Sequence, residues 1–210
     1  MMNGEGLNRG QHADEPHVKC ELTVIPMEGW ERDMLYEDTG LPWILPSPNI
    51  PTSQAALCYP ASGICGELYG FLNIGIGYTL PFGLFGADWM DAGKLKERLD
   101  SYNIPGVSFR TAFYKPFSGR LKDRLVQGVQ FFFTDYEEAP VTLLQFYVMQ
   151  AVSELWPEQK PSAFGLFDKV CGTDHIRKTF FNRWKVEDIL PYWSKDVDEF
   201  KELSKKYILY

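Results

Sequence analysis

The sequence lacks an apolar run long enough to cross a membrane as a helix, which takes about 18 to 20 apolar residues. Its longest apolar stretch, residues 70–86, is interrupted by five glycines and by Pro81. The first 17 residues are polar and glycine-rich, without the apolar core of a signal peptide. We therefore expect no membrane span and no signal peptide in this chain, and the sequence assigns no compartment.

Cysteine and histidine are scarce, with four and three residues among 210. The cysteines are widely spaced and form no C-x-x-C pair, which argues against a disulfide framework and a zinc site. Motifs of serine hydrolases and zinc proteases are missing, and the G-x-G at residues 75–77 lacks the third glycine of a dinucleotide-binding turn. We expect neither a metal nor a cofactor.

Positive charge is also in short supply, because 21 basic residues face 28 acidic ones and the net charge is -7. No cluster of Lys and Arg suggests contact with phosphates, so nucleic acid is excluded as a partner. One stretch, residues 110–124 (RTAFYKPFSGRLKDR), is both basic and aromatic. It is either a solvated loop or a site for an anion such as a carboxylate, with Arg110 as the forked ligand.

What is present fits one globular domain, since 45% of residues are apolar and 23% charged. Apolar periodicity predicts an α+β (mixed α/β) fold, in which a small mixed sheet packs with several helices. The expected strands are residues 18–24, 107–114 and 126–134. The expected helices are residues 53–58, 91–103, 140–156, 164–171, 173–183, 186–193 and 195–207.

A proline-rich segment, residues 41–52 (LPWILPSPNIPT), is the first candidate wall of a binding groove. Four prolines prevent a helix or a central strand and favour a rigid extended loop. Such a loop either lines a groove or follows the surface of the domain. Trp43 and Asn49 are its candidate substrate-binding residues.

A glycine-rich apolar segment, residues 63–82, is the second candidate wall. Glycines among apolar side chains permit the close approach of another chain or a ligand. The side chains with strong polar groups are Glu67, Asn73, Tyr78 and Thr79, and we take them as candidate substrate-binding residues. Glu67 is either a functional carboxylate or a structural hydrogen-bond acceptor.

Motifs spread over nearly the whole chain resemble the NamZ-type exo-β-N-acetylmuramidases, long catalogued as a domain of unknown function. The most specific motifs are TGLPW at residues 39–43 and PSPN at residues 46–49. The others are LTVIP at 22–26, GW at 29–30, YTLPF at 78–82, FGA at 85–87 with Trp89, PGV at 105–107 with FR at 109–110, GVQ at 128–130 with TD at 134–135, and YILY at 207–210.

The resemblance implies a two-domain enzyme that removes terminal N-acetylmuramic acid from peptidoglycan fragments. Its active site would lie between a Rossmann-like N-terminal domain and a smaller C-terminal α/β domain. This chain resembles the C-terminal part, so residues 1–17 are expected to be a flexible remnant of the interdomain region and residues 18–210 the C-terminal domain. The family's proposed catalytic glutamate lies in the N-terminal domain, so no residue here inherits it. Family members are often exported to the periplasm or the cell surface.

One departure from the family concerns residues 73–78. Many relatives have S-E-G-R-G-T here, whereas this chain has N-I-G-I-G-Y. The glycines are kept but the charged positions are both isoleucine, Ile74 and Ile76. Either this branch binds a different sugar, or it uses Asn73 and Tyr78 in place of the charged pair.

Three functional hypotheses follow. The chain is the cleft-forming C-terminal domain of a peptidoglycan-sugar hydrolase, inactive without a separate N-terminal Rossmann-like domain. Alternatively, it is a stand-alone binding module for peptidoglycan-derived sugars. The third hypothesis is an inactive remnant with an exposed apolar surface where another domain would dock.

Overall fold

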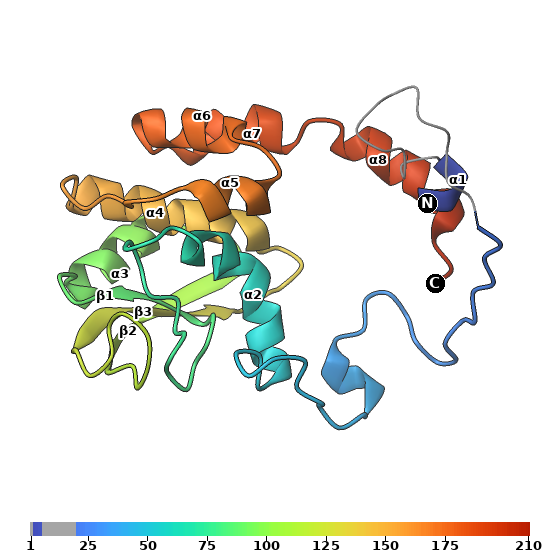
Figure 1. The fold of residues 1–210 in the computed structure, drawn as a ribbon, viewed down its shortest axis with the longest axis horizontal. Coiled ribbons are helices and arrows are strands. Elements are labelled where there is room, and N and C mark those ends of the chain that lie inside the picture. The colour runs from blue at the N-terminus through green and yellow to red at the C-terminus, as the bar shows by residue number, and fades with distance from the viewer. Residues whose placement is uncertain (1, 6–19) are drawn as a thin grey trace. The chain divides into compact units, whose positions relative to one another are not determined.

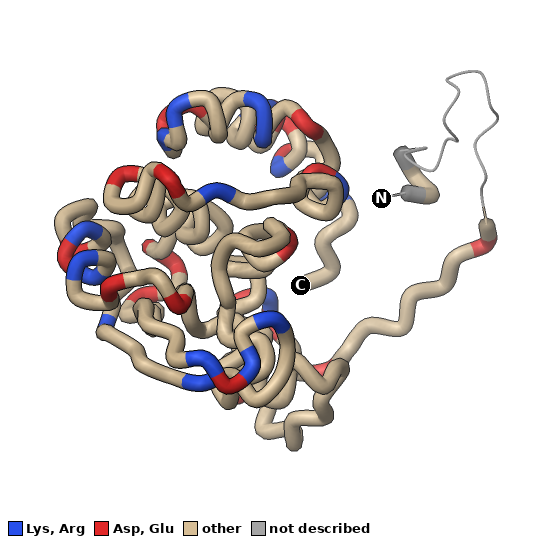
Figure 2. The backbone as a smooth tube through the Cα atoms, turned by 60° about the vertical axis from the view of Figure 1, so that its left-hand side comes forward, with Lys and Arg blue, Asp and Glu red and all other residues tan. Residues whose placement is uncertain are grey.

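The computed structural model describes residues 2–5 and 20–210, which form two compact units (Figure 1). One unit joins the chain up to Pro42 with Ser194–Tyr210, and the other is Trp43–Trp193. The larger unit holds the sheet and most of the helices, as the predicted α+β fold requires. Figure 2 shows basic and acidic residues interspersed over its helices.

An antiparallel sheet of three strands, in the order β1–β3–β2, underlies the larger unit. The strands are β1 (Leu84–Ala87), β2 (Val107–Tyr114) and β3 (Val126–Phe133). Phe109 and Phe131 are opposite each other and buried, whereas the next pair, Arg110 and Gln130, meets through a hydrogen bond outside the core. This alternation confirms the two strands predicted from period-two patterns.

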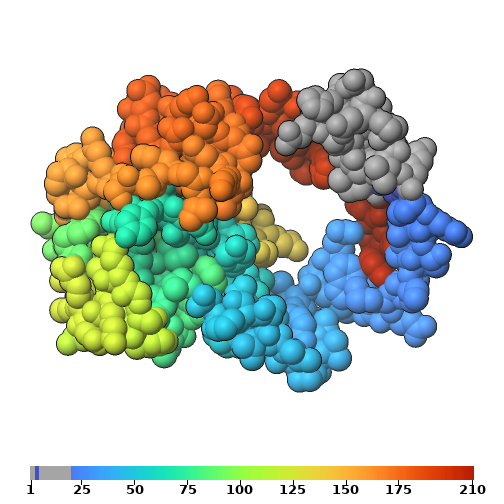
Figure 3. Space-filling model, viewed as in Figure 1, coloured from blue at the N-terminus to red at the C-terminus, as the bar shows by residue number. Residues whose placement is uncertain are grey.

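Helices cover the sheet in successive layers (Figure 1). The helices are α2 (Ser53–Gly66), α3 (Ala92–Ser101), α4 (Leu144–Leu155) after the 3₁₀ turn η2 (Val141–Leu143), α5 (Gly165–Cys171), α6 (His175–Arg183) and α7 (Val186–Trp193). Phe146 of α4 is fully buried, with the rings of Phe180 and Trp193 at 5.1 and 5.3 Å. Many of the aromatic side chains therefore pack in the core. The space-filling view shows the layers in close contact (Figure 3).

Helix α2 is longer than the predicted 53–58 and continues through Pro60. Its buried residues Ala55, Cys58, Ser62 and Cys65 recur at helical spacing, and α2 packs against α4. Gln145 of α4, itself fully buried, accepts the Cys65 N–H at 2.8 Å and donates to the Pro60 carbonyl at 3.1 Å. Tertiary packing and this buried amide thus outweigh the local cost of the proline.

The smaller unit contains α1 (Met2–Glu5), the 3₁₀ turn η1 (Tyr36–Thr39), α8 (Val197–Ser204) and the 3₁₀ turn η3 (Lys205–Tyr207). Trp30 packs edge-on against Tyr210 at 4.8 Å, and the Tyr210 hydroxyl accepts the Met27 N–H. Apart from α1, the predicted flexible segment 1–17 lies outside the described residues.

The predicted strand 18–24 is wrong for residues 20–24, and residues 18 and 19 lie outside the described part. Leu22 and Val24 are 63% and 53% exposed, and none of the strands in the described part pairs with them. Alternation alone does not make a strand, because its N–H and C=O groups need a neighbouring strand. Within residues 2–5 and 20–210, no helix has the length and apolarity needed to cross a membrane.

Replacing Gln145 with Ala should strongly destabilise the protein. The Cys65 N–H and the Pro60 carbonyl would lose a partner in the core, which costs about 2–4 kcal/mol of the free energy of unfolding. Urea denaturation, followed by circular dichroism, measures the free energy of unfolding of each variant. Gln54→Ala is the control, because it removes an exposed amide of α2 that makes only a long contact, 3.5 Å, with the Cys58 sulfur. It should cost less than about 1 kcal/mol. Equal losses in the two variants would contradict this account of α2.

Candidate functional site

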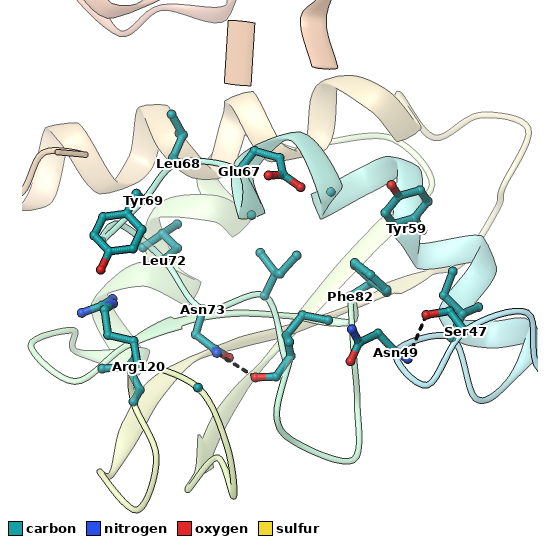
Figure 4. A pocket seen from close by; sticks show the side chains of 18 residues that line it. Ser47, Asn49, Tyr59, Glu67, Leu68, Tyr69, Leu72, Asn73, Phe82 and Arg120 are labelled. Carbon is teal, nitrogen blue, oxygen red and sulfur yellow. Dashed lines mark hydrogen bonds between the residues drawn. The ribbon is translucent and has the colours of Figure 1, made fainter. Parts of the chain in front are cut away.

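A cavity of about 470 Å³ lies within the larger unit, between α2, the segment after it and the loop joining β2 to β3 (Figure 4). Its size is that of a small-molecule site, about 300–1,000 Å³. Apolar side chains such as Leu72 and Phe82 line it together with a few polar ones. The polar lining residues are Ser47, Asn49, Tyr59, Glu67, Tyr69, Asn73 and Arg120.

Asn73 fixes the segment that forms one wall. Its backbone exchanges two hydrogen bonds with Gly86 of β1, at 2.8 and 2.9 Å. Its side-chain Oδ1 accepts the Gly75 N–H at 2.9 Å and the Tyr114 O–H at 2.8 Å, while Nδ2 donates to the Ile76 carbonyl at 3.0 Å. At most one N–H of this amide is left for a ligand. Asn73 therefore acts first as the support of the wall.

Two glycines in this wall let other backbone segments come close. A Cβ on Gly75 would lie 2.1 Å from the Leu80 carbonyl oxygen, and one on Gly77 would lie 2.6 Å from that of Ser118. Both have positive φ, 85° and 82°. The close contact at Gly77 allows its carbonyl to accept the Phe117 N–H at 2.7 Å, which anchors the loop that carries Arg120.

Glu67 caps the C-terminus of α2 and lies half-buried in the cavity wall. Within the described residues its carboxylate has no hydrogen-bond or ion-pair partner. A helix C-terminus carries partial negative charge, so a carboxylate there is electrostatically unfavourable by a few tenths of a kcal/mol. The position of Glu67 thus brings no benefit to the helix, which favours the functional interpretation of this residue over the structural one.

The cavity has chemically different ends (Figure 4). At one end the side chains of Tyr69 and Arg120 point toward one another, and at the other end lie Tyr59 and Asn49, with Glu67 between. Tyr59 and Tyr69 are 50% and 69% exposed, and the Tyr59 ring also makes a T-shaped contact with Phe82 at 4.7 Å. Rings, an amide, a carboxylate and a guanidinium together suit a polar ligand with an apolar face.

The PSPN motif shapes the Asn49 end as a tight turn. The Ile50 N–H donates to the Ser47 carbonyl at 2.9 Å, and the Asn49 N–H donates to the Ser47 hydroxyl at 3.2 Å. Trp43 closes the turn through its indole N–H, 3.4 Å from the Ile50 carbonyl. The Asn49 side-chain amide is exposed and has no hydrogen-bond partner among the described residues.

Of the seven residues predicted from the sequence, the cavity brings together Asn49, Glu67 and Asn73. Trp43 does not line the cavity, but its indole N–H donates to the carbonyl of Ile50, which does. The other three lie outside its lining: Tyr78 stacks at 4.9 Å on Tyr114, Thr79 is exposed, and Arg110 donates to Gln130 at 2.8 Å. Their roles remain predictions.

Sequence reasoning missed Tyr59, Tyr69 and Arg120 as cavity residues. Arg120 lies in the basic aromatic stretch, so the signal was present, but Arg110 was chosen from it. The two isoleucines that replace charged family positions, Ile74 and Ile76, also line the cavity. Its charge therefore comes from Glu67 and Arg120 alone among the lining residues.

A second cavity, of about 370 Å³, is lined by α2, residues 80–83 and β3. Two of its lining residues contact Arg110, whose guanidinium donates to Gln130 and lies 5.5 Å from the centre of the Phe132 ring. Burial raises the pKa of the Cys58 thiol in its wall, which favours the protonated, less nucleophilic form. Within residues 2–5 and 20–210, no cluster of three or more His, Cys, Asp or Glu is arranged to hold a metal.

The free energy of unfolding should fall above pH 10, in part through Tyr114. Burial raises the pKa of this phenol above its usual 10.0, so its stabilising contribution is complete below pH 10 and is lost as the pH rises and the unfolded chain deprotonates first. Each such group contributes up to about 1.4 kcal/mol per pH unit.

Denaturation between pH 8 and 11 tests this expectation. Tyr114→Phe should lose about 1 kcal/mol at neutral pH, because the bond to Asn73 is gone, and should show a shallower alkaline decline. Tyr69→Phe, which removes an exposed phenol, is the control and should decline like the unmodified chain. An equally steep decline in Tyr114→Phe would show that this phenol is not the group responsible.

Two family models and a relative of known function all match this chain to the same family. The family model for the C-terminal part of exo-β-N-acetylmuramidase NamZ matches residues 57–210, and the one for its N-terminal part matches residues 4–54. The chain is 35% identical over 194 residues to the peptidoglycan β-N-acetylmuramidase NamZ of Bacillus subtilis (strain 168), covering 92% of this chain and 46% of that protein.

Among solved structures, a DUF1343 family protein from Bacteroides fragilis NCTC 9343 is similar with a TM-score of 0.89 and 44% identity. The similarity covers 100% of this chain and 54% of that one. The chain therefore spans about half the length of the relatives it matches.

Proposed function

The chain belongs to the NamZ family of peptidoglycan glycoside hydrolases, and we propose that it forms the C-terminal, sugar-binding half of such an enzyme. The observation that carries the proposal is the cavity with an unpaired Glu67 carboxylate between two exposed tyrosines. The apolar face of a pyranose packs on aromatic rings, and its hydroxyls donate to a carboxylate.

The proposed ligand is a peptidoglycan-derived sugar that carries N-acetylmuramic acid, the residue that the relative in Bacillus subtilis is named for. The side-chain amide of Asn49 can both donate and accept, as an N-acetyl group and neighbouring hydroxyls require. All lining residues lie within Trp43–Trp193 of this chain, with Ser47, Asn49 and Ile50 in the stretch that matches the N-terminal family model, so binding is proposed to need no second polypeptide. A cavity lined by one chain also supports the alternative hypothesis of a stand-alone sugar-binding module, because such a module needs to bind the sugar and not to hydrolyse it.

Hydrolysis is proposed to need the family's Rossmann-like N-terminal domain, from the same or another polypeptide. The family resemblance assigns the catalytic glutamate to that domain, and glycoside hydrolysis usually takes two carboxyl groups flanking one bond. Exposed apolar side chains support such a partner: Ile25 is 88% exposed and Ile44 is 80% exposed, both within the stretch that matches the N-terminal family model.

Glu67→Gln should weaken the binding of N-acetylmuramic acid about tenfold without destabilising the fold. Binding weakens because a carboxylate accepts hydrogen bonds from sugar hydroxyls more strongly than an amide does. The fold is not destabilised because the substitution removes an unfavourable negative charge from the C-terminus of α2. Isothermal titration calorimetry measures the dissociation constant, and thermal denaturation should show an unchanged or slightly raised Tm. Glu158→Gln, at an exposed position outside the cavity, is the control. A Tm that falls by several degrees with unchanged affinity would make Glu67 a structural residue.

The purified chain alone should not hydrolyse a chromogenic N-acetylmuramide, because it supplies only part of the proposed cleft. Absorbance of the released chromophore measures turnover, with a complete NamZ enzyme as the positive control. Turnover by the chain alone that is lost in Glu67→Gln would mean that the chain holds its own catalytic carboxylate, and the proposed division of labour would be wrong.

A further inference from the structure

Arg120 differs from the other arginines of the larger unit in having no side-chain partner. The larger unit contains six arginines, all in its described residues. Arg98, Arg124, Arg177 and Arg183 form ion pairs with Glu154, Asp88, Asp168 and Asp188, and Arg110 donates to Gln130. For Arg120 no such bond is present, and its guanidinium lies at the wall of the cavity. It is therefore a cation that the fold itself does not use.

The backbone that presents Arg120 is held firmly. The next residue, Leu121, is 2% exposed and packs in a small buried cluster with Leu84, Tyr114 and Val126. The loop is closed by the Asp123 N–H, which donates to the Pro116 carbonyl at 2.8 Å, and it is tied to the cavity wall by the bond from Phe117 to Gly77. The guanidinium thus starts from a fixed point, although the side chain itself is exposed.

The surroundings of Arg120 define what it can bind. It is the sole cation among the lining residues, and it lies beside Tyr69 at one end of the cavity (Figure 4). Glu67, the sole anion, lies nearer the middle, where a carboxylate on the ligand would be repelled. This order of charges favours a ligand whose own carboxylate lies at the Tyr69 end, since a guanidinium binds a carboxylate through two parallel hydrogen bonds.

We propose that Arg120 is the specificity residue of this cavity and selects acidic sugars by pairing with their carboxylate substituent. The inference rests on the proposed function, because it assigns an orientation to the sugar in that same site. N-acetylmuramic acid differs from N-acetylglucosamine by a lactyl ether that carries a carboxylate. The two sugars therefore separate the contribution of Arg120 from that of the rest of the cavity.

Calorimetric or NMR titration of the full chain with both sugars tests the proposal. The unmodified chain should bind N-acetylmuramic acid about 5- to 20-fold more tightly than N-acetylglucosamine, as expected for a charged pair at a partly solvated site. The preference should shrink as salt is raised from 50 mM to about 500 mM, because the pair is screened. Arg120→Ala should abolish the preference by lowering the affinity for N-acetylmuramic acid to that for N-acetylglucosamine, and the binding of N-acetylglucosamine that remains shows that the cavity is intact.

Arg124→Ala is the matched control, since it removes an arginine of the same loop that is already paired with Asp88. It should keep the full preference, and Arg120→Lys should keep part of it, because lysine retains the charge without the fork. If Arg120→Ala still prefers N-acetylmuramic acid, or if the unmodified chain binds both sugars equally, the assignment of Arg120 is wrong while the proposed function stands. If the unmodified chain binds neither sugar at millimolar concentration, the proposed function fails and the assignment of Arg120 fails with it.

Discussion

The hydrogen bonds of Asn73 are the constraint on which the cavity depends. The Asn73 backbone pairs with Gly86 of β1, and its side chain bonds Tyr114 at the end of β2 and the turn at Gly75 and Ile76. Leu72 and Ile74 anchor this segment of the cavity wall in the core, and the amide fixes the turn that follows them.

From this wall the order extends to the charged groups. Gly77 lets the loop between β2 and β3 come within hydrogen-bond distance, and that contact sets the starting point of Arg120. On the opposite wall, the length of α2 decides where Glu67 lies, and Gln145 adds two hydrogen bonds to α2, at the Pro60 carbonyl and the Cys65 N–H. The half-buried amide of Asn73 and the buried amide of Gln145 therefore help to position a cation and an anion that have no partner among the described residues.

The regular elements were largely predictable, and the cavity was predictable in part. The strands 107–114 and 126–134 and most helices follow from local periodicity, which survives folding because one face of each is buried. The extension of α2 was missed because Pro60 is a strong local signal, and only distant packing overrides it. Asn49, Glu67 and Asn73 were found as polar residues in unusual segments. Tyr69 and Arg120 lie about 50 residues apart in sequence, and only the tertiary contact at Gly77 brings their segments to one wall.

The central claim is that this cavity, rather than another surface, binds a peptidoglycan-derived sugar. The most direct measurement is a map of backbone amide chemical shifts in ¹H–¹⁵N spectra during titration with N-acetylmuramic acid. We expect saturable shifts concentrated at Glu67, Tyr69, Gly75 and Arg120. Shifts centred on Gln130 and Phe132 of the second cavity, or no saturable shifts at all, would contradict it.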